Sequence, residues 1–154
     1  MLTQLENRVP PPLVLIICLV LMYGLAALDA QYYIPTTAIK VGAAGIALLG
    51  LACMLSGAYS FRQARTTVNP LQPKKASSLV RSGIFRYSRN PMYLGMLFIA
   101  LGWLLYLASA LSMIGVIVFV AYIQRLQIQP EERAMQALFG AEFTEYRASV
   151  RRWL

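Results

Sequence analysis

The stretch "NPMYLGMLFIALGWLLYLASALSMIGVIVFVAYIQ", Asn90–Gln124, decides the fold because it contains no charged side chain. Its 35 residues would make about 52 Å of helix, whereas a helix needs roughly 20 residues to cross a bilayer. The small and polar residues of "LASALS" (Leu107–Ser112) permit a tight turn near its middle. The stretch therefore predicts a short hairpin of two membrane helices whose ends return to one face of the membrane.

Two further apolar stretches precede the hairpin, at Pro11–Leu28 and Thr37–Phe61. The chain is 58% hydrophobic and 13% charged, with a mean hydropathy of +0.58, which is too apolar for a soluble domain of 154 residues. We therefore expect an all-α integral membrane protein with four transmembrane helices. The first stretch follows Arg8 as a signal peptide would, but its long core and its prolines favour a retained helix.

The positive charges predict the orientation of the chain. If the N-terminus, the loop Arg62–Arg89 and the tail from Arg125 share one side, that side holds 13 of the 14 Lys and Arg residues, and only Lys40 lies opposite. Such a bias indicates that both termini and the loop are cytoplasmic, at the inner membrane of a bacterium. The net charge of +8 is explained by topology and by anionic head groups, without nucleic acid as a partner.

The composition also limits the chemistry. The chain has no histidine, and Cys18 and Cys53 fall inside predicted spans without the spacing of metal ligands, so no metal site is expected. Residues 1–61 are interpreted as a two-helix scaffold within a single domain of residues 1–154, and residues 62–154 as its functional part. Small residues in Lys40–Ser60 predict a helix-packing face, which leaves a homodimer possible.

Polar residues concentrate in two segments. The loop Arg62–Pro91 has three prolines and seven Lys or Arg residues, and the apolar stretch "LVRSGIF" (Leu79–Phe85) interrupts it. Because long loops in compact proteins are often binding loops, we interpret it as one. In the second segment, Arg125–Leu154, Pro130 suits the first position of a helix, and the acidic pair Glu131 and Glu132 then falls in the first turn.

The remainder of the second segment predicts an amphipathic helix, with a bend at Gly140, on the cytosolic face. Its apolar residues recur every three or four positions, at Met135, Phe139, Phe143, Tyr146, Val150 and Trp153. The hairpin should bring the two polar segments together, with Arg89, Asn90 and Tyr93 beside Arg125, Glu131 and Glu132. Cationic and amide groups opposite two carboxylates would suit a zwitterionic ligand.

The segment "LVRSGIFRYSRNPMYLG", followed after the hairpin by "PEERAMQALFGAEFTEYRASV", resembles the integral-membrane methyltransferases of the isoprenylcysteine carboxyl methyltransferase and phospholipid N-methyltransferase superfamily. The family pattern is Arg-His-Pro-x-Tyr, a hairpin, and a Glu-Glu pair leading into a helix. The resemblance runs from about Thr66 to the C-terminus. It implies methyl transfer from S-adenosylmethionine, on the cytosolic side, to a small lipophilic or membrane-embedded carboxylate, amine or thiol.

The resemblance also assigns candidate residues. Those that match the cofactor-binding segments of the family, or lie beside them, are Leu79, Val80, Phe85, Arg89, Asn90, Pro91, Met92, Tyr93, Glu131 and Glu132. A carboxylate can accept hydrogen bonds from ribose or from the ammonium group of the cofactor, and Arg89 can hold its carboxylate. The rings of Phe85 and Tyr93 can pack on adenine or near the sulfonium.

Two positions depart from the family pattern. Asn90 stands where relatives carry histidine, and Gln127 aligns with the arginine that meets the acceptor carboxylate in isoprenylcysteine enzymes. Arg125 is the nearest substitute for that arginine, so Arg125 and Gln127 are the candidate substrate-binding residues. The acceptor is therefore not restricted to a prenylcysteine carboxylate.

Two other functions remain open on the sequence alone. The C-terminal halves of NADPH-dependent sterol reductases resemble the chain in their Arg-His-Pro-type segment before a hairpin, although four spans are few for that group. A non-enzymatic membrane protein could instead bind anionic lipid or a partner through the basic loop residues Lys74, Lys75 and Arg81.

Overall fold

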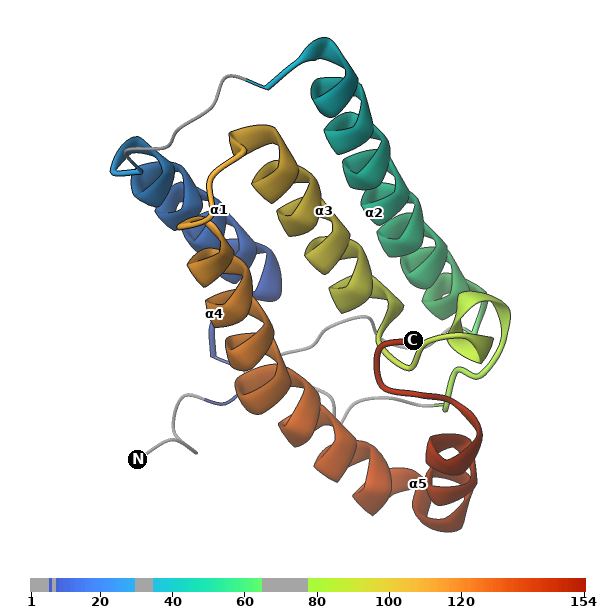
Figure 1. Cartoon of the computed structure of the whole chain (residues 1–154). Helices are drawn as coiled ribbons and strands as arrows, with labels where there is room; N and C mark the ends of the chain where they lie inside the picture. The colour runs from blue at the N-terminus through green and yellow to red at the C-terminus, as the bar shows by residue number, and fades with distance from the viewer. Residues whose placement is uncertain (1–5, 7, 30–34, 65–77) are drawn as a thin grey trace.

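The computed structural model describes residues 6, 8–29, 35–64 and 78–154, and these residues form helices and no strand. The expectations for Lys74, Lys75 and the rest of loop residues 65–77 lie outside the described residues. The helices are α1 (Pro11–Ala27), α2 (Thr37–Gln63), α3 (Pro91–Leu107), α4 (Met113–Ile123) and α5 (Gln129–Ser149), with a 3₁₀ turn η3 (Gly83–Arg86) and a π-helical segment η4 (Gln124–Ile128) (Figure 1).

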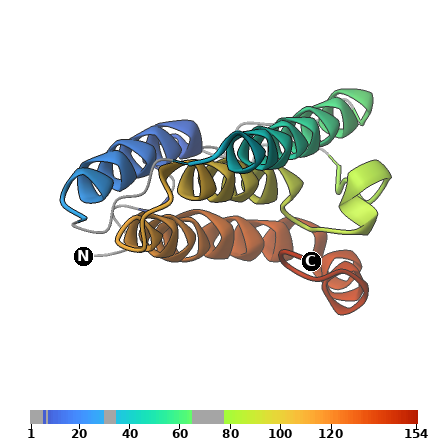
Figure 2. The ribbon, with the colours of Figure 1, turned by 45° about the horizontal axis from the view of Figure 1, so that its top comes forward.

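The central helix of the bundle is α3, which lies between α1 and α2 on one side and α4 on the other (Figure 2). The predicted hairpin of α3 and α4 is confirmed, and the connection falls where "LASALS" placed it. Ala108 adopts a left-handed conformation there, with φ of 49°. Both arms therefore bring their polar ends to the lower end of the bundle in Figure 1.

The contact between α2 and α3 is made by small residues. Ala43, Gly50 and Gly57 are the buried positions of α2 that face α3. A Cβ added to Gly50 would lie 2.4 Å from the carbonyl oxygen of Gly95, and one added to Gly102 would lie 2.7 Å from that of Ala43. Small residues allow helices in lipid to approach this closely. Since α3 occupies this face, these small residues are not available for a homodimer contact.

Polar side chains attach α1 to the hairpin. The indole Nε1 of Trp103 donates to the carbonyl of Leu19 at 3.1 Å, and the Ser112 hydroxyl donates to that of Met22 at 2.8 Å. Both acceptors are backbone groups within α1, and Met22 itself is fully buried. Three helices are thereby joined at the end opposite the polar segments.

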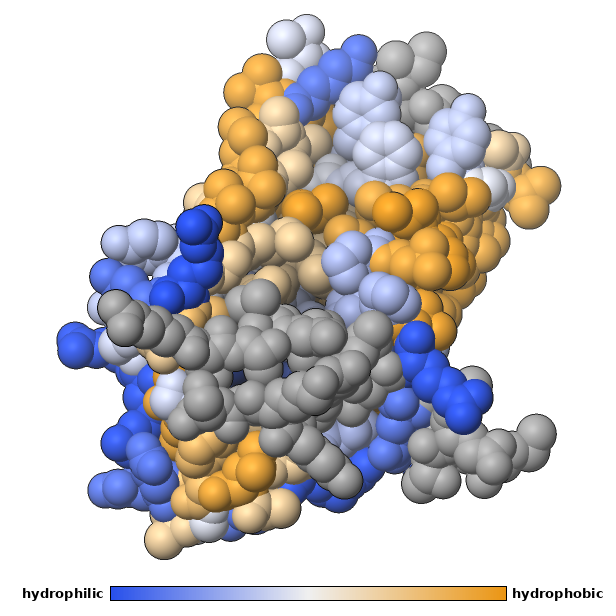
Figure 3. Space-filling view, turned by 180° about the vertical axis from the view of Figure 1, so that it is seen from behind, coloured by the Kyte–Doolittle hydropathy of each residue, from blue (hydrophilic) through white to orange (hydrophobic). Residues whose placement is uncertain are grey.

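Apolar side chains cover much of the outer surface. Two helical stretches, Thr37–Gln63 and the continuous Met113–Ser149, are long and apolar enough to cross a membrane, and α1 and α3 are shorter apolar helices of 17 residues each. Figure 3 shows hydrophobic residues spread over the upper part of one face, and hydrophilic ones gathered mainly toward the lower end. Exposed apolar surface of this extent is typical of a protein solvated by lipid.

Pro130 lies in the first turn of α5 together with Glu131 and Glu132, as predicted, but α5 continues α4 without a break. The chain stays helical from Met113 to Ser149, and Pro130 is accommodated by the π-helical segment just before it, where the amide of Gln129 bonds the carbonyl of Gln124. A proline inside a regular α-helix clashes with the carbonyl four residues earlier, and a π turn widens the helix at that point. The acidic pair therefore lies within a long helix and not at a free helix start.

The C-terminal helix is bent and shorter than predicted. The bend at Gly140 is confirmed by its φ of 48° and ψ of −118°. The helix ends at Ser149, and Val150 is extended, with φ of −126° and ψ of 133°. The expectation that Val150 and Trp153 continue the helical apolar face was therefore wrong, whereas Phe143 and Tyr146 are buried as expected.

Substituting Gly50 with alanine should destabilise the bundle. The new methyl group would overlap the backbone of Gly95, and overpacking of this kind costs about 1–3 kcal/mol. Thermal unfolding in detergent measures the effect. Gly45→Ala is the matched control, because nothing lies within 4 Å of a Cβ at that position. Equal melting temperatures for the two variants would contradict the α2–α3 packing.

Candidate functional site

The two polar segments meet where α3 begins. Arg89 Nη2 lies 2.9 Å from Glu132 Oε1, and the hydroxyl of Tyr93 donates to Glu131 Oε1 at 2.5 Å. The hairpin thus brings Arg89, Asn90 and Tyr93 to Glu131 and Glu132, as the sequence predicted, whereas Arg125, which was expected beside them, is exposed and makes none of these contacts. We call Arg89, Asn90, Tyr93, Glu131, Glu132 and Arg152 the polar cluster.

Glu132 is an ionised carboxylate held by two arginines. Arg152 donates Nε to Oε1 at 3.0 Å and Nη2 to Oε2 at 2.6 Å, and Arg89 adds its bond to Oε1. Burial would raise the pKa of Glu132, but the hydrogen bonds and charges of Arg152 and Arg89 outweigh it and hold the pKa below its ordinary value. A carboxylate has about four acceptor positions, and these three bonds leave it capacity for a further donor.

The neighbouring Glu131 has a different environment. It follows the apolar stretch Met113–Ile123 and lies outside it, and it accepts a hydrogen bond from the Tyr93 hydroxyl. Burial raises the pKa of Glu131 to about 8; the Tyr93 hydrogen bond opposes the rise, and the negative charge of Glu132 adds to it. At neutral pH, Glu131 is therefore protonated most of the time.

The C-terminal segment, Val150–Leu154, is bound to the start of α3. Arg89 Nη1 donates to the carbonyls of Arg147 at 3.0 Å and Val150 at 2.9 Å. The backbone amide of Arg89 donates to the carbonyl of Arg151 at 3.0 Å. The side-chain amide of Asn90 donates to the carbonyl of Arg152 at 2.9 Å. These bonds satisfy the Arg147 carbonyl in the last turn of α5 and three carbonyls beyond the helix end, and they hold the C-terminal segment against α3.

Sequence reasoning missed Arg152 as a member of the cluster. In a helix that continued to the C-terminus, Arg147, Arg151 and Arg152 would lie on the face opposite the apolar residues. The only signal available was the density of arginines in "RASVRRWL". Once the helix ends at Ser149, the direction of each side chain no longer follows from helical periodicity.

The loop candidates pack mainly against α2 and α5. Val80 and Phe85 are buried and Leu79 is half-buried. The Phe85 ring lies edge-on to Phe61, with centroids 5.1 Å apart, and its carbonyl accepts from the buried Tyr146 hydroxyl at 2.7 Å. In this arrangement the Phe85 ring helps fix the loop to α2.

The remaining candidates at the start of α3 also contact α2. Pro91 is fully buried, and Met92 is half-buried beside Gly57, where an added Cβ would lie 2.9 Å from Met92 Cγ. Their side chains therefore fix the position of the polar cluster relative to the bundle.

The two substrate candidates differ in exposure. Arg125 is exposed, whereas Gln127 has 0% of its surface exposed. The Gln127 amide nitrogen donates to the carbonyl of Val9 at 2.8 Å, but its oxygen has no hydrogen-bond partner among the described residues. Arg89 Nε is likewise buried without a partner in the described part of the chain. Such atoms require explanation, because unsatisfied buried polar groups are costly.

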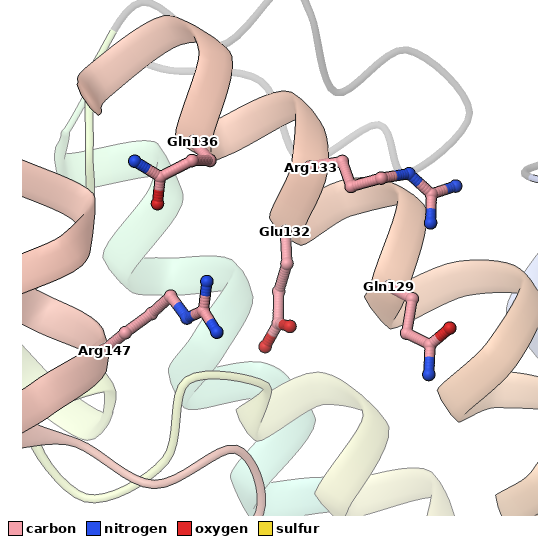
Figure 4. A pocket seen from close by; sticks show the side chains of 5 residues that line it. All are labelled: Gln129, Glu132, Arg133, Gln136 and Arg147. Atoms are coloured by element: carbon pink, nitrogen blue, oxygen red, sulfur yellow. The ribbon is translucent and has the colours of Figure 1, made fainter.

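A pocket of about 350 Å³ lies beside the polar cluster, lined by Gln129, Glu132, Arg133, Gln136 and Arg147. Glu132 and Arg147 point toward one another from the two arms of α5 (Figure 4). The bend at Gly140 creates this arrangement by folding the second arm back. Within the described ranges, no group of three or more His, Cys, Asp or Glu residues could hold a metal ion.

Comparison with known proteins relates the chain to methyltransferases. Residues 38–142 match the sequence model of the phospholipid methyltransferase family. An uncharacterized protein of Haemophilus influenzae is 44% identical over 63 residues, which cover 41% of this chain and all of that protein. The protein-S-isoprenylcysteine O-methyltransferase of Saccharomyces cerevisiae is 32% identical over 110 residues, which cover 67% of this chain and 46% of the yeast protein. No solved structure matches the chain.

Removing the Arg152 side chain should destabilise the protein. Arg152→Ala leaves a partly buried Glu132 with one cationic partner, and losing a charge-assisted hydrogen bond costs about 1–3 kcal/mol. The penalty should be full above the ordinary pKa of a glutamate and shrink as pH falls through the lowered pKa of Glu132, because protonation ends the pairing.

Thermal unfolding at neutral and acidic pH measures this penalty. Arg151→Ala is the control, because the Arg151 side chain is exposed and only its backbone contacts Arg89. A penalty that is equal for the two variants, or independent of pH, would contradict the pairing of Arg152 with Glu132.

Proposed function

Because the chain belongs to the phospholipid methyltransferase family, we propose that it transfers a methyl group from S-adenosylmethionine to a small lipophilic or membrane-embedded acceptor. The observation that carries the proposal is Glu132, held between Arg89 and Arg152 at the edge of a pocket with Arg147 opposite. A carboxylate facing a guanidinium is complementary to the amino-acid end of the methyl donor.

The size and polarity of the pocket fit this ligand. Its volume of about 350 Å³ lies in the range of small-molecule sites, roughly 300–1,000 Å³. Glu132 would accept from the ammonium group, while Arg147, which also lines the pocket, would donate to the carboxylate. When bound, S-adenosylmethionine supplies an electrophilic methyl group. The chain's own contribution is to hold donor and acceptor in line and to exclude water.

The proposed topology places this pocket at the cytosolic face of a bacterial inner membrane. Helices α1, α2 and α3, and α4 continued by η4, would each cross the bilayer, with both termini and the loop at 62–89 on the cytosolic side. Two features support it: the apolar exposed surface of these helices, and the position of Lys40 near the start of α2, opposite the arginine-rich end. The acceptor would reach the site from the bilayer.

Family membership favours methyl transfer over the two alternatives. An NADPH-dependent reductase would need a site for a large dinucleotide. The pocket beside Glu132 is small, and its carboxylate and guanidinium groups match the ammonium and carboxylate groups of an amino acid. A purely lipid-binding or partner-binding role gives no reason for a carboxylate held by two arginines beside a pocket.

Calorimetric titration with S-adenosylhomocysteine, the demethylated product, tests the proposal. We expect saturable binding by the wild type and an affinity at least tenfold lower for Glu132→Gln, because a charge-assisted bond contributes about 1.5–3 kcal/mol. Glu142→Gln is the matched control, because Glu142 pairs with Arg81 outside the pocket. Absence of product binding, or binding of NADPH in its place, would overturn the proposed function.

A further inference from the structure

The carboxylate that borders the pocket is already bonded to a cation of the chain itself. Arg152 donates Nε to Glu132 Oε1 at 3.0 Å and Nη2 to Oε2 at 2.6 Å, so its guanidinium engages both carboxylate oxygens. Arg89 adds a third bond, from Nη2 to Oε1 at 2.9 Å. Two parallel bonds of this kind are the strongest contact that an arginine makes with a carboxylate. A ligand with an ammonium group therefore meets an internal competitor at Glu132.

Of the two arginines at Glu132, Arg152 is the more easily released. The Arg89 side chain is 10% exposed and also bonds the carbonyls of Arg147 and Val150, so its movement would break the joint between α3 and the end of α5. The Arg152 side chain is 29% exposed, and within the described part of the chain its guanidinium bonds to Glu132 alone. Release would place the charge of Arg152 in water and return rotamer freedom to a long side chain.

The backbone that carries Arg152 is anchored independently of its side chain. The carbonyl of Arg151 accepts from the backbone amide of Arg89 at 3.0 Å, and the carbonyl of Arg152 accepts from the Asn90 side chain at 2.9 Å. Both bonds use backbone carbonyls, so the guanidinium can leave its partner while the C-terminal segment stays in place against α3. The part that can move is therefore one side chain and not the whole segment.

The charges around the pocket favour exchange over simultaneous binding. Glu132 is already bonded to two guanidinium groups, and Arg147 points toward it from the other arm of α5 (Figure 4). S-adenosylmethionine carries an ammonium and a sulfonium group against one carboxylate, so its net charge is positive. Like charges repel more strongly in a partly buried site than in water. Departure of Arg152 would remove one positive charge from the site as the ligand brings its own.

We propose that Arg152 is a competitor of the methyl donor that is built into the chain: its guanidinium pairs with Glu132 in the free protein, and the ammonium group of S-adenosylmethionine displaces it. The inference rests on the proposed methyl transfer and concerns the regulation of the same site. The apparent affinity for the donor is reduced to the extent that Arg152 holds Glu132. Arg152 thus stabilises the free protein and weakens ligand binding, so its removal should change these two properties in opposite directions.

Calorimetric titration of the whole chain in detergent with S-adenosylmethionine and S-adenosylhomocysteine tests the proposal. Arg152→Ala should bind S-adenosylmethionine at least about threefold more tightly than the wild type, because no charge-assisted pair must first be broken, although this variant unfolds at a lower temperature. Arg151→Ala is the matched control and should bind as the wild type does, because the Arg151 side chain is exposed.

The titrations separate failure of this inference from failure of the proposed function. An affinity of Arg152→Ala for S-adenosylmethionine that is equal to or below that of the wild type would overturn the inference and leave the proposed function intact. Lower affinity would make Arg152 a support of the bound ligand, and equal affinity would make its role purely structural. Absence of binding of both ligands to the wild type and to both variants would overturn the proposed function together with the inference.

Two further measurements do not depend on the folding of Arg152→Ala. Arg152→Lys keeps the charge but lacks the planar fork that engages both carboxylate oxygens, so it should bind S-adenosylmethionine more tightly than the wild type. Nuclear magnetic resonance of isotope-labelled protein can follow the Nε–H group of Arg152, identified by its absence from Arg152→Lys. Its exchange with water should become at least about tenfold faster when S-adenosylmethionine saturates the protein, because a hydrogen-bonded N–H is protected from exchange. An affinity of Arg152→Lys no higher than that of the wild type, or exchange that stays slow at saturation, would overturn the inference.

Discussion

The lower end of the bundle depends on the guanidinium group of Arg89. Its donors reach the carboxylate of Glu132 and the carbonyls of Arg147 and Val150, and its own amide reaches Arg151. Only 10% of this side chain is exposed, and a buried cation is tolerated only when it is paired and hydrogen-bonded. One residue thus joins the start of α3, the long helix α5 and the C-terminal segment, and it fixes where the pocket beside Glu132 lies.

The apolar part of the fold follows from the sequence because lipid solvation and helix length leave few alternatives. The uncharged stretch Asn90–Gln124 is too long for one span, so it had to turn, and the turn fell at the small residues around Ala108. The bend at Gly140 was predictable because glycine adopts a positive φ that strains other residues. The proximity of Tyr93 to Glu131 was also predictable, because a helical hairpin begins and ends at the same end of the bundle.

The polar part could not be derived in the same way. A proline in a helix usually lies in the first turn, where the chain has just entered the helix. Before Pro130, the π-helical segment removes the steric conflict, so the helix continues from α4 without a break. Near the end of α5, the Arg147 carbonyl accepts a hydrogen bond from Arg89, which lies 58 residues earlier in the sequence. Such tertiary contacts override local periodicity, so Arg152 entered the cluster unpredicted while Arg125 stayed outside it.

The sequence has no histidine, the side chain that most often titrates near neutral pH. A carboxylate ordinarily titrates far below neutral pH, but burial brings the pKa of Glu131 to about 8, into the range that histidine usually serves. The neighbouring Glu132 remains ionised because Arg152 and Arg89 outweigh the same burial. The difference between the two residues comes from their partners, and the partners come from the hairpin that places Tyr93 and Arg89 on successive faces of α5. One Glu-Glu pair therefore holds a carboxylate that stays ionised and a carboxyl group that titrates near neutral pH.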